Sequence, residues 1–288
     1  MSDRKVVLID GNAAAYRAFF AIPELCTSTG RPTNAVLGFV RMIRQVRRVI
    51  APTHWMAIFD GGLSAERIAV LPSYKAQRPS MPDGLRQQLV SIEEYLNGAG
   101  IPWVRKEGVE ADDLLGVAAR RAADAGAEVL ILTSDKDFYQ LVGEHIRILS
   151  AADVRTTLGT AEVFAKTGVK PEQIVEWLSL VGDSSDNIDG VPGVGAKTAA
   201  KLLGAHGSLE KLWNGLDSVK PDRIRNALAL SKDIVTRNVN LIGLKLDMPL
   251  PELDWSAMAV TAEDRGRLMP FFEQLELRSL ADTVGAGT

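Results

Sequence analysis

Aspartate follows three of the most apolar runs in the sequence. Asp10 comes directly after KVVLI, Asp60 comes directly after HWMAIF, and Asp135 follows EVLIL with a Thr-Ser pair between. Short, continuous apolar runs are typical of strands buried on both faces of a parallel sheet. Because ligands bind beyond the carboxyl ends of such strands, we expect the three side chains to share one crevice. An aspartate in this position can also serve only as the cap of the next helix.

Further carboxylates lie in three short motifs. In VEADDLLG, Glu110 and Asp113 are three residues apart, which places them on one face of a predicted helix with Asp112 beside them. Acidic residues in a first helical turn can also do no more than complement the helix dipole. The motifs TSDKD and GDSSD contribute Asp135, Asp137, Asp183 and Asp186.

So many carboxylates in one crevice would repel one another, and they would therefore raise each other's pKa or require cations. The sole cysteine, Cys26, and the histidines His54, His145 and His206 lie outside the acidic motifs, which argues against zinc. Ligand sets made only of oxygen select hard cations such as Mg²⁺ or Mn²⁺. A pair of these ions suits hydrolysis of a phosphodiester, because they stabilise the attacking and leaving oxygens.

The elements that position these residues can be read from hydrophobic spacing. Apolar strands are expected at 5–9, 54–59, 101–104 and 128–132, with a strand pair at 146–149 and 154–158. Helices are expected at 34–50, at 84–96 and from near 110. This alternation predicts an α/β core over residues 1–160, with a parallel sheet and helices on both faces. No convincing strand follows, so residues 161–288 are predicted to form a helical region.

Composition narrows the class of protein. The chain has 288 residues, 46% of them hydrophobic, and a formal net charge of −3. The charge argues against a nonspecific nucleic-acid coat, although an acidic metal site can lie beside a basic groove. The N-terminus has no signal-peptide core, and no apolar run reaches membrane-spanning length. We expect a cytoplasmic monomer with no membrane association.

The stretch GDSSDNIDGVPGVGAKTAAKLL fails two familiar motifs. A phosphate-binding P-loop requires lysine where Ala196 stands, and a calcium-binding EF-hand loop requires glycine where Ile188 stands. The missing P-loop lysine also excludes a nucleotide-driven ATPase of that type.

Six motifs occur in a specific order: DGNAAAYRAFFA, FDGG, SYKAQRPSMPDGL, VEADDLLG, TSDKDFYQLV and the glycine-rich stretch. With them the chain resembles the 5′-nuclease (flap endonuclease) family, in particular the 5′→3′ exonuclease domain of bacterial DNA polymerase I and its free-standing relatives. The resemblance implies a PIN-like core, a helical arch near 63–82, and a helix–hairpin–helix near 171–204. It also implies a replication and repair enzyme that cuts DNA near 5′ flaps, overhangs or nicks.

The resemblance further implies a role for each residue of the motifs. One metal ion, Mg²⁺ or Mn²⁺, would be held by Asp10, Asp60, Glu110 and Asp112. The second would be held by Asp135, Asp137, Asp183 and Asp186, with Asp113 in the same acidic set. The cations expected near the scissile phosphate are Lys75, Arg78 and Arg17.

Contacts to DNA are expected from the hairpin, the arch and one basic helix. Backbone amides of GVPGVG and the next helix N-terminus would meet a phosphate, and K⁺ is a possible ligand there. The hairpin residues concerned are Gly190, Val191, Gly193, Gly195, Lys197 and Lys201. The basic helix presents Arg41, Arg44 and Arg48. Tyr74 is expected either to stack on a base or to pack under a mobile loop. The segment around Arg67 departs from the family pattern, so a contact between Arg67 and DNA is doubtful.

Two other functions remain open from the sequence. A catalytically weak, structure-specific DNA-binding module would share the fold, but the complete set of carboxylates argues against it. RNA-directed PIN nucleases are usually shorter and have no helix–hairpin–helix. A DNA polymerase is a possible partner.

Overall fold

The computed structural model describes residues 4–249 and 253–284. At its centre lies a six-stranded sheet of order β3-β2-β1-β4-β5-β6. The strands are β1 (Lys5–Asp10), β2 (His54–Phe59), β3 (Trp103–Arg105), β4 (Glu128–Thr133), β5 (Ile146–Ser150) and β6 (Thr157–Leu158). All neighbours pair in parallel except β5 and β6, which are antiparallel. The predicted parallel-sheet core is confirmed.

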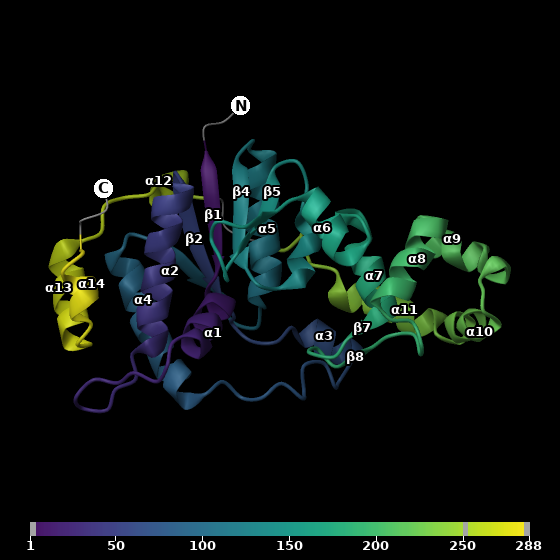
Figure 1. Cartoon of the computed structure of the whole chain (residues 1–288), viewed down its shortest axis with the longest axis horizontal. Coiled ribbons are helices and arrows are strands. Elements are labelled where there is room, and N and C mark those ends of the chain that lie inside the picture. The colour runs from purple at the N-terminus through teal and green to yellow at the C-terminus, as the bar shows by residue number, and fades with distance from the viewer. Residues whose placement is uncertain (1–3, 250–252, 285–288) are drawn as a thin grey trace.

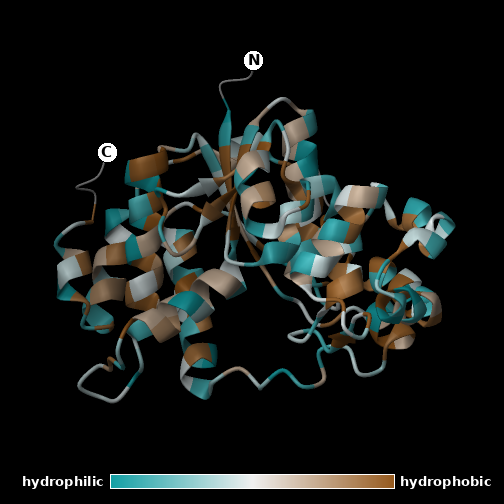
Figure 2. Ribbon diagram, turned by 45° about the vertical axis from the view of Figure 1, so that its right-hand side comes forward, coloured by the Kyte–Doolittle hydropathy of each residue, from teal (hydrophilic) through white to brown (hydrophobic). Residues whose placement is uncertain are grey.

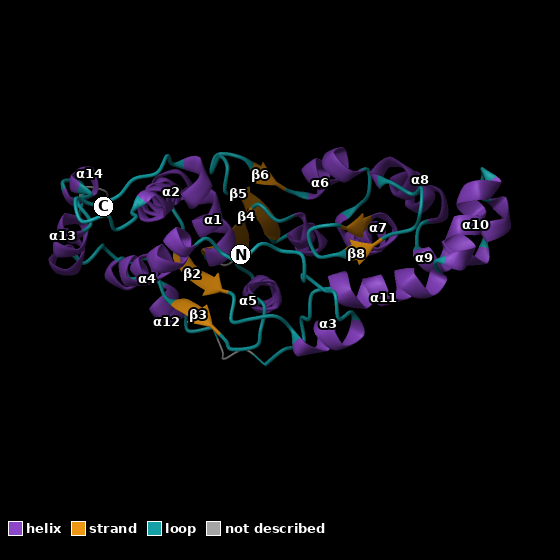
Figure 3. Ribbon diagram, turned by 90° about the horizontal axis from the view of Figure 1, so that it is seen from below, coloured by secondary structure: helices purple, strands orange, loops and turns teal. Residues whose placement is uncertain are grey.

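Helices cover both faces of this sheet, as Figure 3 shows from below. In β1 the side chains alternate: Val6 and Leu8 belong to one hydrophobic cluster, while Val7 and Ile9 belong to the other. The first cluster includes α5 (Ala111–Asp124), and the second includes α1 (Gly11–Ala21), α2 (Asn34–Ile50) and α4 (Asp83–Gly98). Burial on both faces explains why the strands are continuously apolar, and Figure 2 shows them as a brown centre.

The strand order brings the acidic strand ends together. Strand β1 lies between β2 and β4, so the chain order reverses on either side of it. Asp10 is in register with Ile58 at the end of β2, and Ile9 is in register with Leu132 near the end of β4. This is the switch point at which ligands bind in open parallel sheets.

A long segment bridges the edge of the sheet between β2 and α4. It contains α3 (Ala65–Val70), followed by turns, and in Figure 1 it runs from α3 below α1 to α4. The segment corresponds to the predicted arch, but only α3 is an α-helix. Pro72, Pro79 and Pro82 explain the difference, because proline disfavours helix for itself and for the residue before it.

The helical region lies to one side of the sheet (Figure 1). Its elements are α6 (Thr160–Thr167), α7 (Ile174–Val181), α8 (Ala196–His206), α9 (Leu209–Asn214), α10 (Asp222–Leu230) and α11 (Lys232–Ile242). Between α7 and α8 the structure adds a short antiparallel pair, β7 (Gly182–Asp183) and β8 (Ile188–Asp189), which the sequence pattern did not predict. The last two predicted metal ligands lie here, Asp183 at the end of β7 and Asp186 in the turn before β8.

The end of the described chain returns to the core. The elements α12 (Trp255–Met258), α13 (Arg265–Gln274) and α14 (Arg278–Ala281) lie on the far side from α8–α10 (Figure 1). Leu268 and Phe272 of α13 join the hydrophobic cluster of α2 and α4. The predicted helical region 161–288 is thus divided: α6–α11 lie to one side of the sheet, and α13 packs against α2 and α4. Within residues 4–249 and 253–284, no helix has both the length and the apolar character needed to cross a membrane.

Candidate active site

The strand-end aspartates are built into the edge of the sheet by hydrogen bonds. Asp10 caps α1: its Oδ1 accepts the Ala13 N–H at 3.0 Å, and its Oδ2 accepts the Thr133 hydroxyl at 2.8 Å. Asp60 accepts the Ala111 N–H at 2.8 Å, which joins the end of β2 to the start of α5. Asp10 therefore caps a helix and also lies among the strand-end carboxylates, so the two roles predicted for it are compatible.

A second acidic group lies in a neighbouring cavity of about 680 Å³. Asp135 accepts the Asp137 N–H at 2.9 Å at the start of η1 (Lys136–Leu141). Asp183 accepts the Ser185 N–H at 2.8 Å. The acidic residues that line the cavity are Asp135, Asp137, Asp183 and Asp186, and Arg17 lines it too. The predicted second metal set is thus brought together with one of the predicted cations.

Burial and mutual repulsion perturb these carboxylates. Burial raises the pKa of Asp10 to about 7, with Asp60 and Asp135 adding to the shift. Burial likewise raises the pKa of Asp137 to about 8, with contributions from Asp135 and Asp183. The pKa of Asp112 is also raised, first by burial and then by Asp10 and Asp135. The two acidic groups therefore act on each other electrostatically, which favours a bound cation.

Cationic side chains of the bridging segment reach this acidic surface. The Lys75 ammonium contacts a carboxylate oxygen of Glu110 and lies 3.8 Å from Asp186. Arg78 pairs with Asp186 and donates from Nε to the Ser185 carbonyl at 3.2 Å. Lys75 and Arg78 thus lie against the acidic groups, and their catalytic role stays a prediction.

One cation at the site was missed by sequence reasoning. Lys136 lies between Asp135 and Asp137 and pairs with Asp183 at 3.0 Å. In an extended segment the Lys136 side chain would point away from those of its two neighbours. Lys136 instead begins the 3₁₀ turn η1, in which its side chain can lie on the same side as the carboxylates. The exposed aromatic side chain of Phe20, which also lines the cavity, was not singled out either, although the YRAFF motif contains it.

No three histidine, cysteine, aspartate or glutamate side chains form a metal-binding group within the part of the chain that the structure describes. Lys75, Arg78 and Lys136 form ion pairs with carboxylate oxygens of the predicted metal ligands. Three features nevertheless suit divalent cations. The donors are all oxygens, several pKa values are raised, and one buried oxygen of Asp137 has no hydrogen-bond partner.

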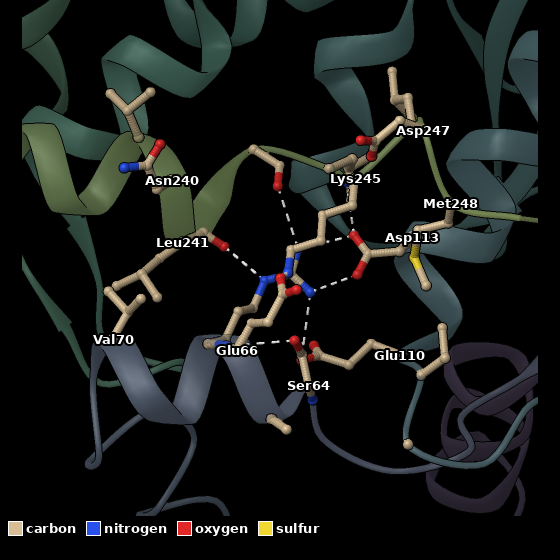
Figure 4. A pocket seen from close by; sticks show the side chains of 18 of the residues that line it. Ser64, Glu66, Val70, Glu110, Asp113, Asn240, Leu241, Lys245, Asp247 and Met248 are labelled. Carbon is tan, nitrogen blue, oxygen red and sulfur yellow. Dashed lines mark hydrogen bonds and ion pairs between the residues drawn. The ribbon is translucent and has the colours of Figure 1, made fainter.

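Asp113 corrects the predicted acidic set. Its two oxygens accept bonds from Arg67 at 2.7 and 2.8 Å, and the Lys245 N–H donates to it at 3.0 Å. Both side chains are almost completely buried. Figure 4 shows Asp113 in a cavity that Glu110 also lines and that is distinct from the cavity of the second acidic group. Asp113 is therefore occupied by Arg67, and Arg67 does not reach solvent to contact DNA.

Two predicted DNA contacts are engaged inside the protein. Tyr74 is only 4% exposed and donates its hydroxyl to Glu110 at 3.0 Å. Of the two predictions for Tyr74, the structure therefore agrees with packing inside the protein. Arg44 forms an ion pair with Glu263 at 2.7 Å and donates to the Leu280 carbonyl at 3.1 Å. These contacts turn Arg44 toward α14, while Arg41 and Arg48 are exposed.

The glycine-rich stretch connects β8 to α8. Gly193 and Gly195 are exposed, and Gly193 has a φ of 78°, which favours glycine. Val191 is an exception, because it is buried and its N–H donates to the Leu180 carbonyl at 2.8 Å. Its amide is therefore not free for a phosphate. Lys197 and Lys201 are exposed on α8, and Gly190 is half-buried.

Comparisons with known proteins agree with this architecture. Residues 5–168 match the model of the 5′-3′ exonuclease N-terminal resolvase-like domain, and residues 169–265 match the 5′-3′ exonuclease C-terminal SAM fold. DNA polymerase I of Bacillus caldotenax is 36% identical over 98% of this chain, and that of Pseudomonas aeruginosa is 38% identical over 99%. The matched region is 32% of each polymerase, so the chain spans about a third of these relatives.

Solved structures share the fold over nearly the whole chain. A structure of T5 5′-exonuclease has a TM-score of 0.71 at 21% identity and covers 95% of this chain and 99% of its own. The catalytic core of Rad2 has a TM-score of 0.62 at 17% identity and covers 94% of this chain and 88% of its own. The predicted fold is thus confirmed. The chain belongs to the 5′-3′ exonuclease family of nucleases.

Proposed function

We propose that this chain is a metal-dependent, structure-specific 5′ nuclease that cuts DNA near 5′ ends and 5′-flap junctions. The observation that carries the proposal is the acidic edge of the sheet, which two cations of the bridging segment contact. Lys75 reaches Glu110 and Asp186, and Arg78 reaches Asp186. Such a combination can neutralise a phosphodiester and hydrolyse it.

The proposed metal ligands follow the two acidic groups. Asp10, Asp60, Glu110 and Asp112 would hold one divalent cation, and Asp135, Asp137, Asp183 and Asp186 would hold the second. A pair of Mg²⁺ or Mn²⁺ ions supplies an activated water and charge stabilisation for the displacement at phosphorus. Structural relatives support divalent-metal binding in general: one structure is of T5 5′-exonuclease with divalent zinc, and another is of a bacteriophage T5 flap endonuclease complex with DNA and metal ions.

The protein's own cations would act on the scissile phosphate. Arg78 can present two N–H groups to a phosphate, whereas Lys75 provides a single movable charge. Both would exchange their carboxylate partners for phosphate oxygens as the substrate enters. Arg17, which lines the cavity of the second acidic group, would contact the same phosphate from α1.

Binding of the DNA duplex would come from the exposed glycine-rich stretch and the N-terminal part of α8. Gly193, Gly195, Lys197 and Lys201 are all exposed there, and Gly190 is half-buried beside them. Amides at a helix N-terminus suit a phosphate, and carbonyls in such a turn would suit K⁺. Exposed Arg41 and Arg48 would add contacts on α2. A DNA polymerase acting in replication and repair is the proposed partner, because the polymerase relatives contain a matching region.

A labelled double-flap DNA tests this function directly. With Mg²⁺ the protein should release the 5′ flap near its junction, leaving a 5′-phosphate and a 3′-hydroxyl, and with EDTA it should release nothing. Single-stranded RNA of matched sequence serves as the competing substrate. Tight flap binding without cleavage would favour the DNA-binding module, and preferred cleavage of RNA would favour an RNA-directed nuclease.

A further inference from the structure

Arg67 lies at a buried junction of three parts of the protein (Figure 4). It belongs to α3 at the start of the bridging segment and is only 4% exposed. Its guanidinium donates twice to Asp113 of α5, at 2.7 and 2.8 Å. It also donates to the carbonyls of Leu241 and Gly243, at 2.9 and 3.2 Å.

The two carbonyls belong to the C-terminal end of α11. The last carbonyls of a helix have no partner within the helix, and a cation is favoured there by the helix dipole. Arg67 satisfies two of them while it neutralises Asp113. A planar fork of five N–H groups is needed for this set of contacts, and lysine cannot provide it.

The same guanidinium also contacts Glu110, with Nη1 lying 3.4 Å from Oε1. That oxygen accepts the Ser64 N–H at 3.1 Å as well. The other oxygen, Oε2, contacts Tyr74 and Lys75. Arg67 and Ser64 therefore hold Glu110 by one oxygen, and the second oxygen faces Lys75, which lies 3.8 Å from Asp186 of the second acidic group. We call the space between these carboxylates the acidic cleft.

We propose that Arg67 is a positioning residue for metal binding: it fixes Glu110 with one oxygen toward the cleft and keeps Asp113 out of the ligand set. The inference rests on the proposed function, because it assumes that Glu110 helps to hold a divalent cation. Arg67 does not touch the substrate. It acts through Glu110, and it ties the bridging segment to α11 at the same time.

A purely structural role for Arg67 makes a different prediction, and a double variant separates the two roles. Arg67→Met alone leaves a buried, unpaired Asp113 and should destabilise the fold. Arg67→Met with Asp113→Leu removes both charges and fills similar volume, so it should recover part of the lost melting temperature. The Leu241 and Gly243 carbonyls and the Lys245 N–H still lose their side-chain partners, and the contact to Glu110 stays lost.

The measurement is Mn²⁺ affinity by calorimetry on the DNA-free protein, beside thermal unfolding without metal. The double variant should bind Mn²⁺ about 10- to 100-fold more weakly, which is the usual cost of losing a residue that orients a metal ligand. Arg67→Lys, which keeps a charge near Asp113, should fold and show a similar loss. As a matched control, Arg225→Met with Asp222→Leu removes an ion pair of α10 and should leave Mn²⁺ affinity unchanged.

A further variant tests whether Asp113 is a ligand. Asp113→Asn should keep Mn²⁺ affinity within about twofold, whereas Asp135→Asn should weaken it by at least about tenfold, within the range for perturbed metal sites. The inference is wrong if the stable double variant and Arg67→Lys bind Mn²⁺ as the unmodified protein does. It is also wrong if Asp113→Asn loses affinity as strongly as Asp135→Asn. Failure of the unmodified protein to cut flap DNA would instead refute the proposed function.

Discussion

A single negative charge at the start of α8 should weaken DNA binding without altering the cleft. Gly195 immediately precedes α8, is exposed, and has a φ of −92°, which any residue can adopt. A Cβ added there meets nothing within 4 Å. Aspartate is also a favourable residue at a helix N-cap, so Gly195→Asp should not destabilise the fold. Gly193 is a poorer choice, because its φ of 78° would strain any side chain.

The expected magnitude follows from Coulomb's law. Two unit charges about 5 Å apart repel by about 1 kcal/mol in water and by about 3 kcal/mol at the effective dielectric constant of a protein surface. Gly195→Asp should therefore weaken binding by about 5- to 150-fold. The control is Gly204→Asp, an exposed position on the same helix that also has open space around it. It lies about 13 Å further along the helix, beyond the Debye length of about 8 Å at physiological salt.

The assay measures affinity for double-flap DNA in Ca²⁺, to block cleavage, and the single-turnover rate in Mg²⁺ at saturating protein. Gly195→Asp should lose affinity and keep most of its rate, and Gly204→Asp should change neither by more than about twofold, because its charge is screened. Equal affinities for both variants would show that no phosphate approaches the start of α8. A lost rate with intact affinity would show that this helix serves the chemistry instead.

Further predictions concern the cleft and its charges. Lys75→Ala should lower the single-turnover rate by about 10²-fold or more, as expected for a lost electrostatic stabiliser, with a much smaller change in affinity; an unchanged rate would exclude Lys75 from the mechanism. Asp183→Asn should impair Mn²⁺ binding and cleavage while DNA affinity in Ca²⁺ stays equal or rises, and a parallel loss of DNA affinity would contradict the assignment. The logarithm of the affinity should fall linearly with the logarithm of salt concentration, with a slope of several units, and a flat response would mean that binding does not depend on phosphate contacts. The fold raises the pKa of Asp137 to about 8, so the folded state retains this proton more tightly than the unfolded chain. The metal-free protein should therefore lose stability as pH rises from about 4 to 8, and calorimetry should show a shallower loss for Asp137→Asn.

The acidic strand ends were predictable because they rest on local pattern. Asp10 and Asp60 follow buried strands, and parallel strands bring such ends to one edge whatever the details of packing. Asp135 follows the same rule at β4, and its cap on η1 fixes it there.

At VEADDLLG the helix α5 begins just after Glu110, which has extended backbone angles, and Asp113 lies within its first turn. The two side chains nevertheless lie on the same side, because Nη1 of Arg67 is 3.4 Å from Glu110 and 2.7 Å from Asp113. Helical spacing did not indicate that Arg67, which is far from Asp113 in the sequence, would neutralise this carboxylate.

Long-range partners account for the other differences. Arg44 pairs with Glu263, and Tyr74 donates to Glu110, yet nothing near either residue in the sequence indicates these contacts. The strand pair β7–β8 is only two residues long on each side, too short to give an alternating pattern. Such features depend on tertiary packing, which overrides local propensity.

We propose that the carboxylates of the two acidic groups hold a pair of divalent ions and release the cations that now contact them. Anomalous diffraction from crystals of the protein with Mn²⁺ and a flap DNA that resists cleavage would locate these ions. We predict one manganese peak at Asp10, Asp60, Glu110 and Asp112, a second at Asp135, Asp137, Asp183 and Asp186, and Lys75 and Arg78 on the phosphate. Manganese bound elsewhere at saturation, or Lys75 still paired with Glu110 beside the bound phosphate, would show that these carboxylates do not hold the ions as proposed.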